Sequence, residues 1–221
     1  MVLVVYASQT SNSLNAATSL CSSLSLPPPL PLDTYIQTLP PTNLLIIILS
    51  SYGHGASPLG GRLFRSVLSK PGLNFKNLKF CLLGLGSRDY ITFFFNPKFT
   101  TLRLIDEGAT LIKTPSFDPV KGGVDPECDG VGVADSSGDD QDVVIERWVK
   151  YVKDVVVPEF EDKQNVEVEG KEVILEEARR VYEEENGEEV KKQINYGGVR
   201  RGLIVIILSI AAKMMMNYMT K

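Results

Sequence analysis

One run of six apolar residues constrains the fold of this chain most strongly. The run Leu44–Leu49 reads Leu-Leu-Ile-Ile-Ile-Leu and is followed at once by the polar pair Ser50-Ser51. A strand with one wet face alternates apolar and polar residues, whereas a continuous apolar run of this length is typical of a strand buried on both faces. Such strands belong to parallel sheets that helices cover on both sides. The run therefore predicts an α/β protein.

Segments on either side of this run can supply the rest of such a fold. Short apolar segments are expected to form further strands, and segments with helical periodicity are expected to form helices between them. The expected strands are 2–6, 33–37, 79–83 and 109–112, and the expected helices are 13–25, 61–69, 95–107 and 143–157. Together with the apolar run they predict an α/β chain with a parallel sheet of four or five strands.

Several local features refine this prediction. The helix expected at 143–157 has an apolar stripe that includes Trp148 and should close the sheet. Pro97 is placed in the first turn of the helix expected at 95–107, where proline is tolerated. The prolines at 27–31 and 40–41 predict a poorly formed second strand. Residues 115–140 are rich in Pro, Gly, Asp and Ser and are expected to form a surface excursion.

Three loops leave the carboxyl ends of expected strands, at residues 8–13, 50–58 and 84–94. Because those ends meet at one edge of a parallel sheet, the loops should converge on one crevice. The first loop is rich in Ser, Thr and Asn and precedes a helix, whose free N–H groups and dipole favour an anion such as a phosphate. The other two contain glycines and one tyrosine each, Tyr52 and Tyr90. Taken alone, the first loop would be interpreted as the cap of a helix, and each tyrosine as a surface residue. The three loops together favour a binding site for a ligand with a phosphate and an aromatic ring.

Composition excludes several other classes of function. The net charge of −4 argues against a general nucleic-acid binder, and a single histidine, His54, excludes a His-rich metal site. The three cysteines form no CxxC pair, which argues against a disulfide scaffold and fits a reducing compartment. Met1 leads directly into the first expected strand, so no leader peptide is expected. These features predict a cytoplasmic protein.

The last third of the chain divides into two further segments. Residues 158–198 are dominated by Glu and Lys and are expected to form an acidic linker, within which 173–185 could form a solvated helix. Residues 199–221 form a hydrophobic tail, interrupted by Lys213 and Asn217 in its second half. Two alternatives stay open for residues 203–219: a C-terminal membrane anchor, or a strand or amphipathic helix that docks on a partner. The predicted domain is thus 1–157.

Four segments of that domain resemble the motifs of flavodoxin-like domains. Residues 4–13 resemble the opening strand followed by S-Q-T-G-x-S/T, and residues 51–55 resemble the second loop, S/T-T/Y-G-x-G. Residues 80–90 resemble the third loop, F-G-L-G-D/N-x-x-Y, and residues 138–141 resemble the G-D-D/E-x that opens the final helix. The resemblance covers residues 1–157 and is greatest to the FMN domains of NADPH-dependent diflavin oxidoreductases. It implies an α/β flavodoxin-like three-layer sandwich with a five-stranded parallel sheet.

The resemblance implies FMN as the cofactor and assigns its contacts residue by residue. The first loop would wrap the phosphate, Tyr52 and Tyr90 would stack on the flavin ring, and the backbone of Gly53, Leu85 and Gly86 would meet the ring edge. Asp140 would lie near the flavin, although Asp139-Asp140 could equally be the N-terminal charge of a helix. The full predicted set is Ser8, Gln9, Thr10, Ser11, Asn12, Ser13, Ser50, Ser51, Tyr52, Gly53, Leu85, Gly86, Ser87, Arg88, Asp89, Tyr90, Phe94 and Asp140.

Two residues depart from the family pattern within these loops. Ser11 stands where the family usually has Gly, which is costly if that position needs a positive φ angle. Phe94 stands where Asn is usual, so a polar contact could be lost.

The resemblance implies an electron-transfer module. It would accept electrons from an FAD/NADPH-containing reductase and pass them to a haem or iron–sulfur protein, and acidic residues around the crevice would steer a basic partner. Two alternatives remain: a flavodoxin-fold interaction module that has lost cofactor binding, as the residues at 11 and 94 suggest, and a truncated diflavin reductase.

Overall fold

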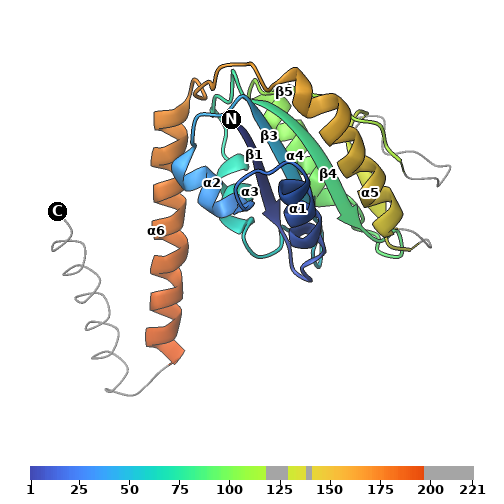
Figure 1. The fold of residues 1–221 in the computed structure, drawn as a ribbon. Coiled ribbons are helices and arrows are strands. Elements are labelled where there is room, and N and C mark those ends of the chain that lie inside the picture. Colours follow the sequence, from blue (N-terminus) through green and yellow to red (C-terminus); the bar gives the residue numbers. More distant parts are fainter. Residues whose placement is uncertain (118–128, 138–140, 197–221) are drawn as a thin grey trace. The chain divides into compact units, whose positions relative to one another are not determined.

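A computed structural model describes residues 1–117, 129–137 and 141–196 of the chain. Its centre is a parallel sheet built from β1 (Val2–Ala7), β3 (Leu44–Ser50) and β4 (Lys79–Gly86). The strand order is β2-β1-β3-β4-β5, and β6 also pairs with β4 (Figure 1). The run Leu44–Leu49 is completely buried at the middle of the sheet, as predicted for a strand covered on both faces.

Two helical layers cover the sheet (Figure 1). On one face lie α1 (Asn12–Ser23) and α5 (Gln141–Tyr151). They pack on strand residues that face this side, such as Val4, Ile46 and Cys81, which are neighbours across β1, β3 and β4. On the other face lie α2 (Leu32–Thr38), α3 (Arg62–Leu68) and α4 (Phe95–Asp106). The predicted α/β three-layer architecture is therefore confirmed.

The apolar stripe of α5 closes the sheet as its periodicity predicts. Trp148 is fully buried, and its indole Nε1 donates a hydrogen bond of 3.0 Å to Oγ1 of Thr114. The ring lies against Gly132, where an added Cβ would come within 2.3 Å of Nε1. Beyond α5 the chain continues through a π-helical turn, Val152–Val156, and a 3-10 turn, Val157–Glu159.

Two strand predictions need correction. The segment 33–37 is not a strand but most of α2, because Leu32, Tyr35 and Ile36 are buried at helical spacing. The edge strand is instead β2 (Leu30–Pro31), whose two residues pair with β1. Its shortness agrees with the prediction of a poorly formed second strand, and a proline is compatible with an edge position.

The fifth position of the sheet is shared by two short strands. β5 (Thr110–Leu111) pairs with the start of β4, and β6 (Gly132–Asp135) pairs with its last four residues. The expected strand at 109–112 therefore supplies only the first part of this position. Part of the segment predicted as a surface excursion, 132–135, is in fact a buried strand that contributes Asp135 to the edge carrying the loops.

Residues Met1–Arg179 form one compact unit. Residues 158–179, predicted as part of an acidic linker, therefore belong with the sheet. Phe160 is buried, its carbonyl oxygen accepts a hydrogen bond of 2.6 Å from Asn43 Nδ2, and Val166 bridges to Thr42. The helix expected at 173–185 lies within α6 (Lys171–Tyr196), whose Ile174 is fully buried rather than solvated.

No helix among the described residues is long and apolar enough to cross a membrane. The tail for which an anchor was considered, residues 199–221, lies outside the described residues.

Candidate functional site

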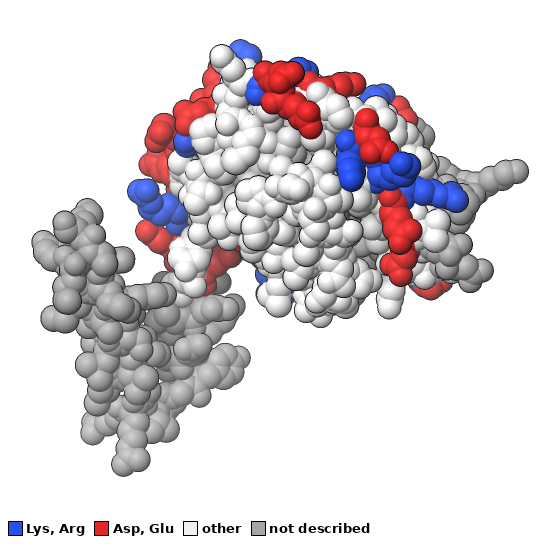
Figure 2. Space-filling model, viewed as in Figure 1, with Lys and Arg blue, Asp and Glu red and all other residues white. Residues whose placement is uncertain are grey.

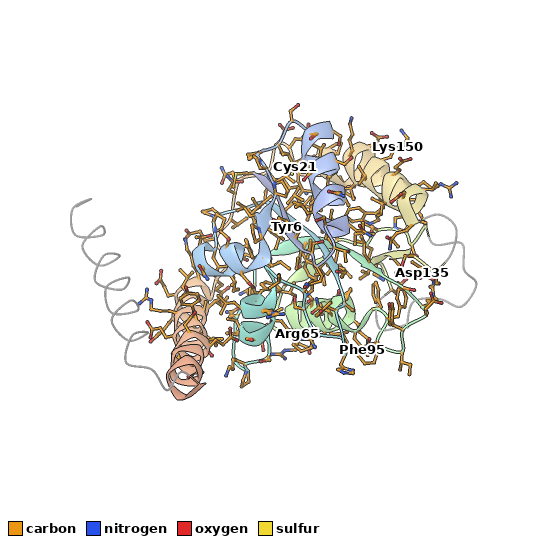
Figure 3. The ribbon with its side chains drawn as sticks, turned by 90° about the horizontal axis from the view of Figure 1, so that it is seen from below. Tyr6, Cys21, Arg65, Phe95, Asp135 and Lys150 are labelled. Atoms are coloured by element: carbon orange, nitrogen blue, oxygen red, sulfur yellow. The ribbon has the colours of Figure 1, made fainter. Side chains whose placement is uncertain are left out.

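The three predicted loops surround one pocket of about 500 Å³ at the carboxyl ends of β1, β3 and β4. Figure 3 looks onto this edge of the sheet, with Phe95 near α3 and α4 and Asp135 toward the α5 side. The pocket is lined by Gln9, Thr10, Asn12, Ser50, Ser51, Tyr52, Gly53, Leu85, Gly86, Ser87, Tyr90, Thr92, Phe93, Ser136 and Gln141. Parallel strands deliver their loops to one edge, so residues far apart in sequence meet here.

Most of the predicted site residues lie in this lining, and the others divide into two groups. Six described residues of the predicted set do not line the pocket: Ser8, Ser11, Ser13, Arg88, Asp89 and Phe94. Asp140 lies outside the described residues. Four lining residues were not predicted: Thr92, Phe93, Ser136 and Gln141.

The first loop ends at the N-terminus of α1. The described structure gives this end no side-chain cap and no acidic residue in its first turn. The hydroxyl of Ser13 is buried and has no hydrogen-bond partner. A helix end with free N–H groups and an unpaired hydroxyl is suited to an anion.

Ser11 adopts the left-handed conformation at this turn, with φ 70° and ψ −8°. Glycine is usual at this position of the motif that residues 4–13 resemble, and a side chain at positive φ is strained. We expect Ser11→Gly to raise the free energy of unfolding by about 0.5–1 kcal/mol. Urea unfolding of the variant checks this.

Ser25→Gly is the matched control, because Ser25 is exposed, has φ 54° and lies outside the pocket. Both variants should gain similar stability. A loss of stability in Ser11→Gly alone would mean that the serine side chain supports the loop.

The second and third loops are tied to each other across the pocket. The hydroxyl of Thr92 donates a hydrogen bond of 2.9 Å to the carbonyl of Gly53, and Tyr52 pairs with Ala56 through both backbone bonds. Tyr52 and Tyr90 remain 47% and 69% exposed, so both rings are available to a ligand. Phe93 adds a third ring, which lies against Gly86, where an added Cβ would be 3.0 Å from it.

Phe94 does not reach the pocket, although it was predicted to do so. Its backbone is left-handed, with φ 65°, and its ring is buried against Gly84. An asparagine, Asn96, lies two residues later. Asn96 Nδ2 donates a hydrogen bond of 2.9 Å to the carbonyl oxygen of Ser50.

A partly buried ion pair holds the third loop against β6. The Arg88 guanidinium lies 2.6 Å from Asp135 Oδ2 and also packs over the Phe93 ring, 4.9 Å from its centroid. Asp135 further accepts hydrogen bonds from the backbone and hydroxyl of Ser137. Burial alone would raise the pKa of Asp135, but the hydrogen bonds from Ser137 and Arg88 outweigh it and hold the pKa below its usual value.

Because the folded-state pKa of Asp135 is lowered, its charge stabilises the fold above the unfolded-state pKa and loses this effect as pH falls. We expect Asp135→Asn to lower the free energy of unfolding by about 1.5 kcal/mol at pH 7. The difference from the parent should shrink below about pH 4, where the unfolded parent begins to bind the proton, and shrink further as pH falls through the lowered pKa of the folded state. Urea unfolding across this pH range measures it, and a difference independent of pH would contradict the assignment.

Gln141, the first residue of α5, connects three sides of the pocket. Its Nε2 donates to the carbonyl oxygens of Ala134 and Gly86, at 3.0 and 3.3 Å, and its Oε1 accepts from Asn12 at 3.4 Å. The motif at 138–141 ends on this residue, whereas the predicted flavin contact was its acidic neighbour, Asp140.

The described pocket lining contains no charged side chain. In the view of Figure 2 the lower part of the sheet domain, toward which β1 and β4 point in Figure 1, shows few charged side chains. Steering by acidic residues would therefore have to come from charges outside the pocket.

The fold and the pocket define an α/β protein with a ligand site at the carboxyl edge of a parallel sheet. Residues 4–148 match the flavodoxin family, and the chain belongs to that family. It is also 36% identical over 96 residues to the inducible nitric oxide synthase of Gallus gallus, which covers 42% of this chain and 8% of that protein. The chain thus corresponds to a small fraction of that relative's length.

Solved structures share the fold at low sequence identity. The flavodoxin of Fusobacterium nucleatum bound to flavin mononucleotide matches with a TM-score of 0.51 and 13% identity, covering 72% of this chain and 98% of that one. A variant of the same flavodoxin, also bound to flavin mononucleotide, matches with a TM-score of 0.54 and 13% identity, covering 72% and 96%.

Proposed function

We propose that the chain is an FMN-binding electron-transfer module. The observation that carries this proposal is the single pocket that joins the N-terminus of α1 to two exposed tyrosines, Tyr52 and Tyr90. Membership of the flavodoxin family and the flavin mononucleotide bound in the Fusobacterium structures support the same cofactor.

The residues of the pocket fit this group. A volume of about 500 Å³ lies in the range of small-molecule sites, roughly 300–1,000 Å³. The α1 N-terminus, where Thr10 and Asn12 line the pocket, would receive the phosphate, while Tyr52 and Tyr90 would pack on the ring. Bound FMN supplies one-electron and two-electron redox chemistry, which protein side chains lack.

The protein's own part is binding, orientation and access. Thr92 joins the third loop to the second, Arg88 joins it to β6, and Gln141 joins Gly86 to Asn12 at the start of α1. The exposure of Tyr52 and Tyr90 leaves the pocket mouth open to another protein, so that electrons could enter and leave there. We propose an FAD/NADPH-containing reductase as the donor and a haem or iron–sulfur protein as the acceptor.

The test is an electron-relay assay with the FMN-loaded full chain. NADPH, an FAD-containing reductase and a ferric cytochrome are combined, and reduction of the haem is followed by absorbance. We expect NADPH oxidation to be coupled to haem reduction only when the loaded chain is present. Equal rates with loaded chain, unloaded chain and free FMN would contradict the proposal.

A second candidate function is an interaction module with the same fold but no cofactor. The strained backbones of Ser11 and Phe94, at φ 70° and 65°, favour it, because both lie within the loops that form the pocket. If this alternative holds, the parent chain takes up no FMN. A truncated diflavin reductase, by contrast, would bind FMN and lack only its own donor domain.

A further inference from the structure

Asn96 is a buried amide that joins the second pocket loop to two helices. It lies in the first turn of α4 and is 1% exposed. Its Nδ2 donates to the carbonyl oxygen of Ser50, at 2.9 Å, and its Oδ1 accepts a hydrogen bond of 2.7 Å from Arg65 of α3. Both ends of the amide are therefore satisfied inside the protein, which a buried polar group requires.

The backbone of Asn96 makes a further bond to the same loop. Phe94, at the N-cap of α4, makes no side-chain capping hydrogen bond. Instead the hydroxyl of Ser51 accepts a hydrogen bond of 3.0 Å from the Asn96 backbone N–H. The hydroxyl of Ser51 thus caps α4 from outside the helix. This cap holds Ser51, and the side-chain amide of Asn96 holds Ser50, so two consecutive residues of the second loop are bound to Asn96.

Arg65 anchors this arrangement to the rigid part of the fold. Its guanidinium lies over the ring of Phe99, 4.2 Å from the centroid, while donating to Asn96. In Figure 3 Arg65 lies beside α3, on the same side of the sheet as Phe95. Stacking on the Phe99 ring restricts the rotation of the planar guanidinium, so the hydrogen bond from Arg65 fixes the orientation of the Asn96 side-chain amide.

The residues that Asn96 holds are walls of the pocket. Ser50 and Ser51 line it, and Tyr52 and Gly53 follow directly. On the other side of Asn96, Thr92 and Phe93 of the third loop also line the pocket. Asn96 itself does not line the pocket, but it lies between two loops that do.

We propose that Asn96, oriented by Arg65, is a positioning residue that sets the separation between the second and third loops and thereby the fit of the flavin ring. This inference rests on the proposed function of the pocket. It predicts that the contribution of Asn96 falls on the ring and not on the phosphate, because the α1 N-terminus is tied to neither Asn96 nor Arg65 by any bond that the described structure contains.

Asn43 provides a matched control at the opposite end of β3. It is also a buried asparagine, 5% exposed, and its Nδ2 donates to the carbonyl oxygens of Phe160 and Lys163, at 2.6 and 3.0 Å. It directly precedes β3, whereas Ser50 ends the same strand. Asn43→Ala therefore removes a comparable set of bonds far from the pocket.

The experiment compares Asn96→Ala, Asn96→Asp and Asn43→Ala with the parent full chain. Binding of FMN and of riboflavin, which has no phosphate, is measured by flavin fluorescence. Hydrogen exchange of residues 50–56 is measured without any flavin. We expect Asn96→Ala to weaken the binding of FMN and of riboflavin by the same factor, about tenfold. This factor corresponds to the free energy of losing one hydrogen bond to a buried partner.

The other variants distinguish positioning from general stability. Asn96→Asp keeps the acceptor for Arg65 and the backbone bond to Ser51, but a carboxylate oxygen cannot donate to the Ser50 carbonyl oxygen. It should therefore lose flavin affinity and exchange protection at 50–56, as Asn96→Ala does. Asn43→Ala should lose stability while binding both flavins as the parent does and leaving exchange at 50–56 unchanged.

Several outcomes would overturn the inference. Unchanged exchange at 50–56 in Asn96→Ala would show that the amide does not hold the loop. A loosened loop with unchanged flavin affinity would show that the fit of the ring does not depend on it. If the parent chain binds no FMN, the proposed function fails, while the exchange measurement still decides whether Asn96 positions the loop.

Discussion

Asn12→Asp should weaken FMN binding by about a hundredfold without destabilising the protein. Asn12 is the exposed first residue of α1 and lines the pocket. A carboxylate there would repel a phosphate dianion by roughly 1–4 kcal/mol per charge pair, but it would favour the helix dipole by about 0.3–1 kcal/mol. The substitution should therefore lower the affinity for FMN without lowering the free energy of unfolding. Flavin titration and urea unfolding measure the two effects separately.

Asn15→Asp is the matched control for this experiment. Asn15 is exposed, belongs to the same helix and does not line the pocket. It should share the neutral or favourable effect on stability and retain FMN affinity within a few-fold. Riboflavin binding should change little in either variant, since that ligand carries no phosphate. Equal losses for FMN and riboflavin in Asn12→Asp would show that α1 does not face the phosphate.

Gly84→Ala should lower the free energy of unfolding by about 2–4 kcal/mol. An added Cβ at Gly84 would lie 2.2 Å from Phe94 Cε2 and 2.7 Å from Pro97 Cβ. Both neighbours are buried, and the proline ring cannot rotate away. Because α4 starts here, the strain would also displace the third loop. Urea unfolding of the full chain measures the loss.

Gly187→Ala tests whether the cost comes from the clash. Gly187 lies in α6 with nothing within 4 Å of an added Cβ, so alanine there should be neutral or stabilising by up to about 1 kcal/mol. In the double variant Gly84→Ala/Phe94→Leu part of the lost stability should return, because the smaller side chain gives the Cβ room. A Gly84→Ala protein as stable as its parent would contradict this account of the packing.

The fold was predictable where one physical signal dominated. The continuous apolar run Leu44–Leu49 and the stripe around Trp148 depend only on burial, and both lie where that pattern predicts. The segment 33–37 was predicted as a strand because Tyr35 and Ile36, over so few residues, fit the two-residue period of a strand as well as the 3.6-residue period of a helix. β6 was missed because Gly132–Asp135 has only two apolar side chains and lies among Gly, Asp and Ser.

The site was predictable as a set of loops and less so as a set of side chains. Topology brings the strand ends together, so Thr10, Tyr52 and Tyr90 meet in one pocket as predicted. Phe94 was wrongly predicted to reach the pocket because the direction of its side chain depends on a left-handed backbone conformation, which the sequence does not reveal. Asn96 and Gln141 were missed because their partners lie on other elements, although both follow motif positions by only one or two residues.

The most direct test of this account is a titration of the purified full chain with FMN and riboflavin, followed by the visible flavin spectrum. The pocket joins the free end of α1 to the rings of Tyr52 and Tyr90, so we expect stoichiometric uptake of one FMN, a shifted flavin spectrum and much weaker binding of riboflavin. A chain that stays colourless with excess FMN, and whose flavin spectrum is that of free FMN, would contradict the assignment of a flavin site.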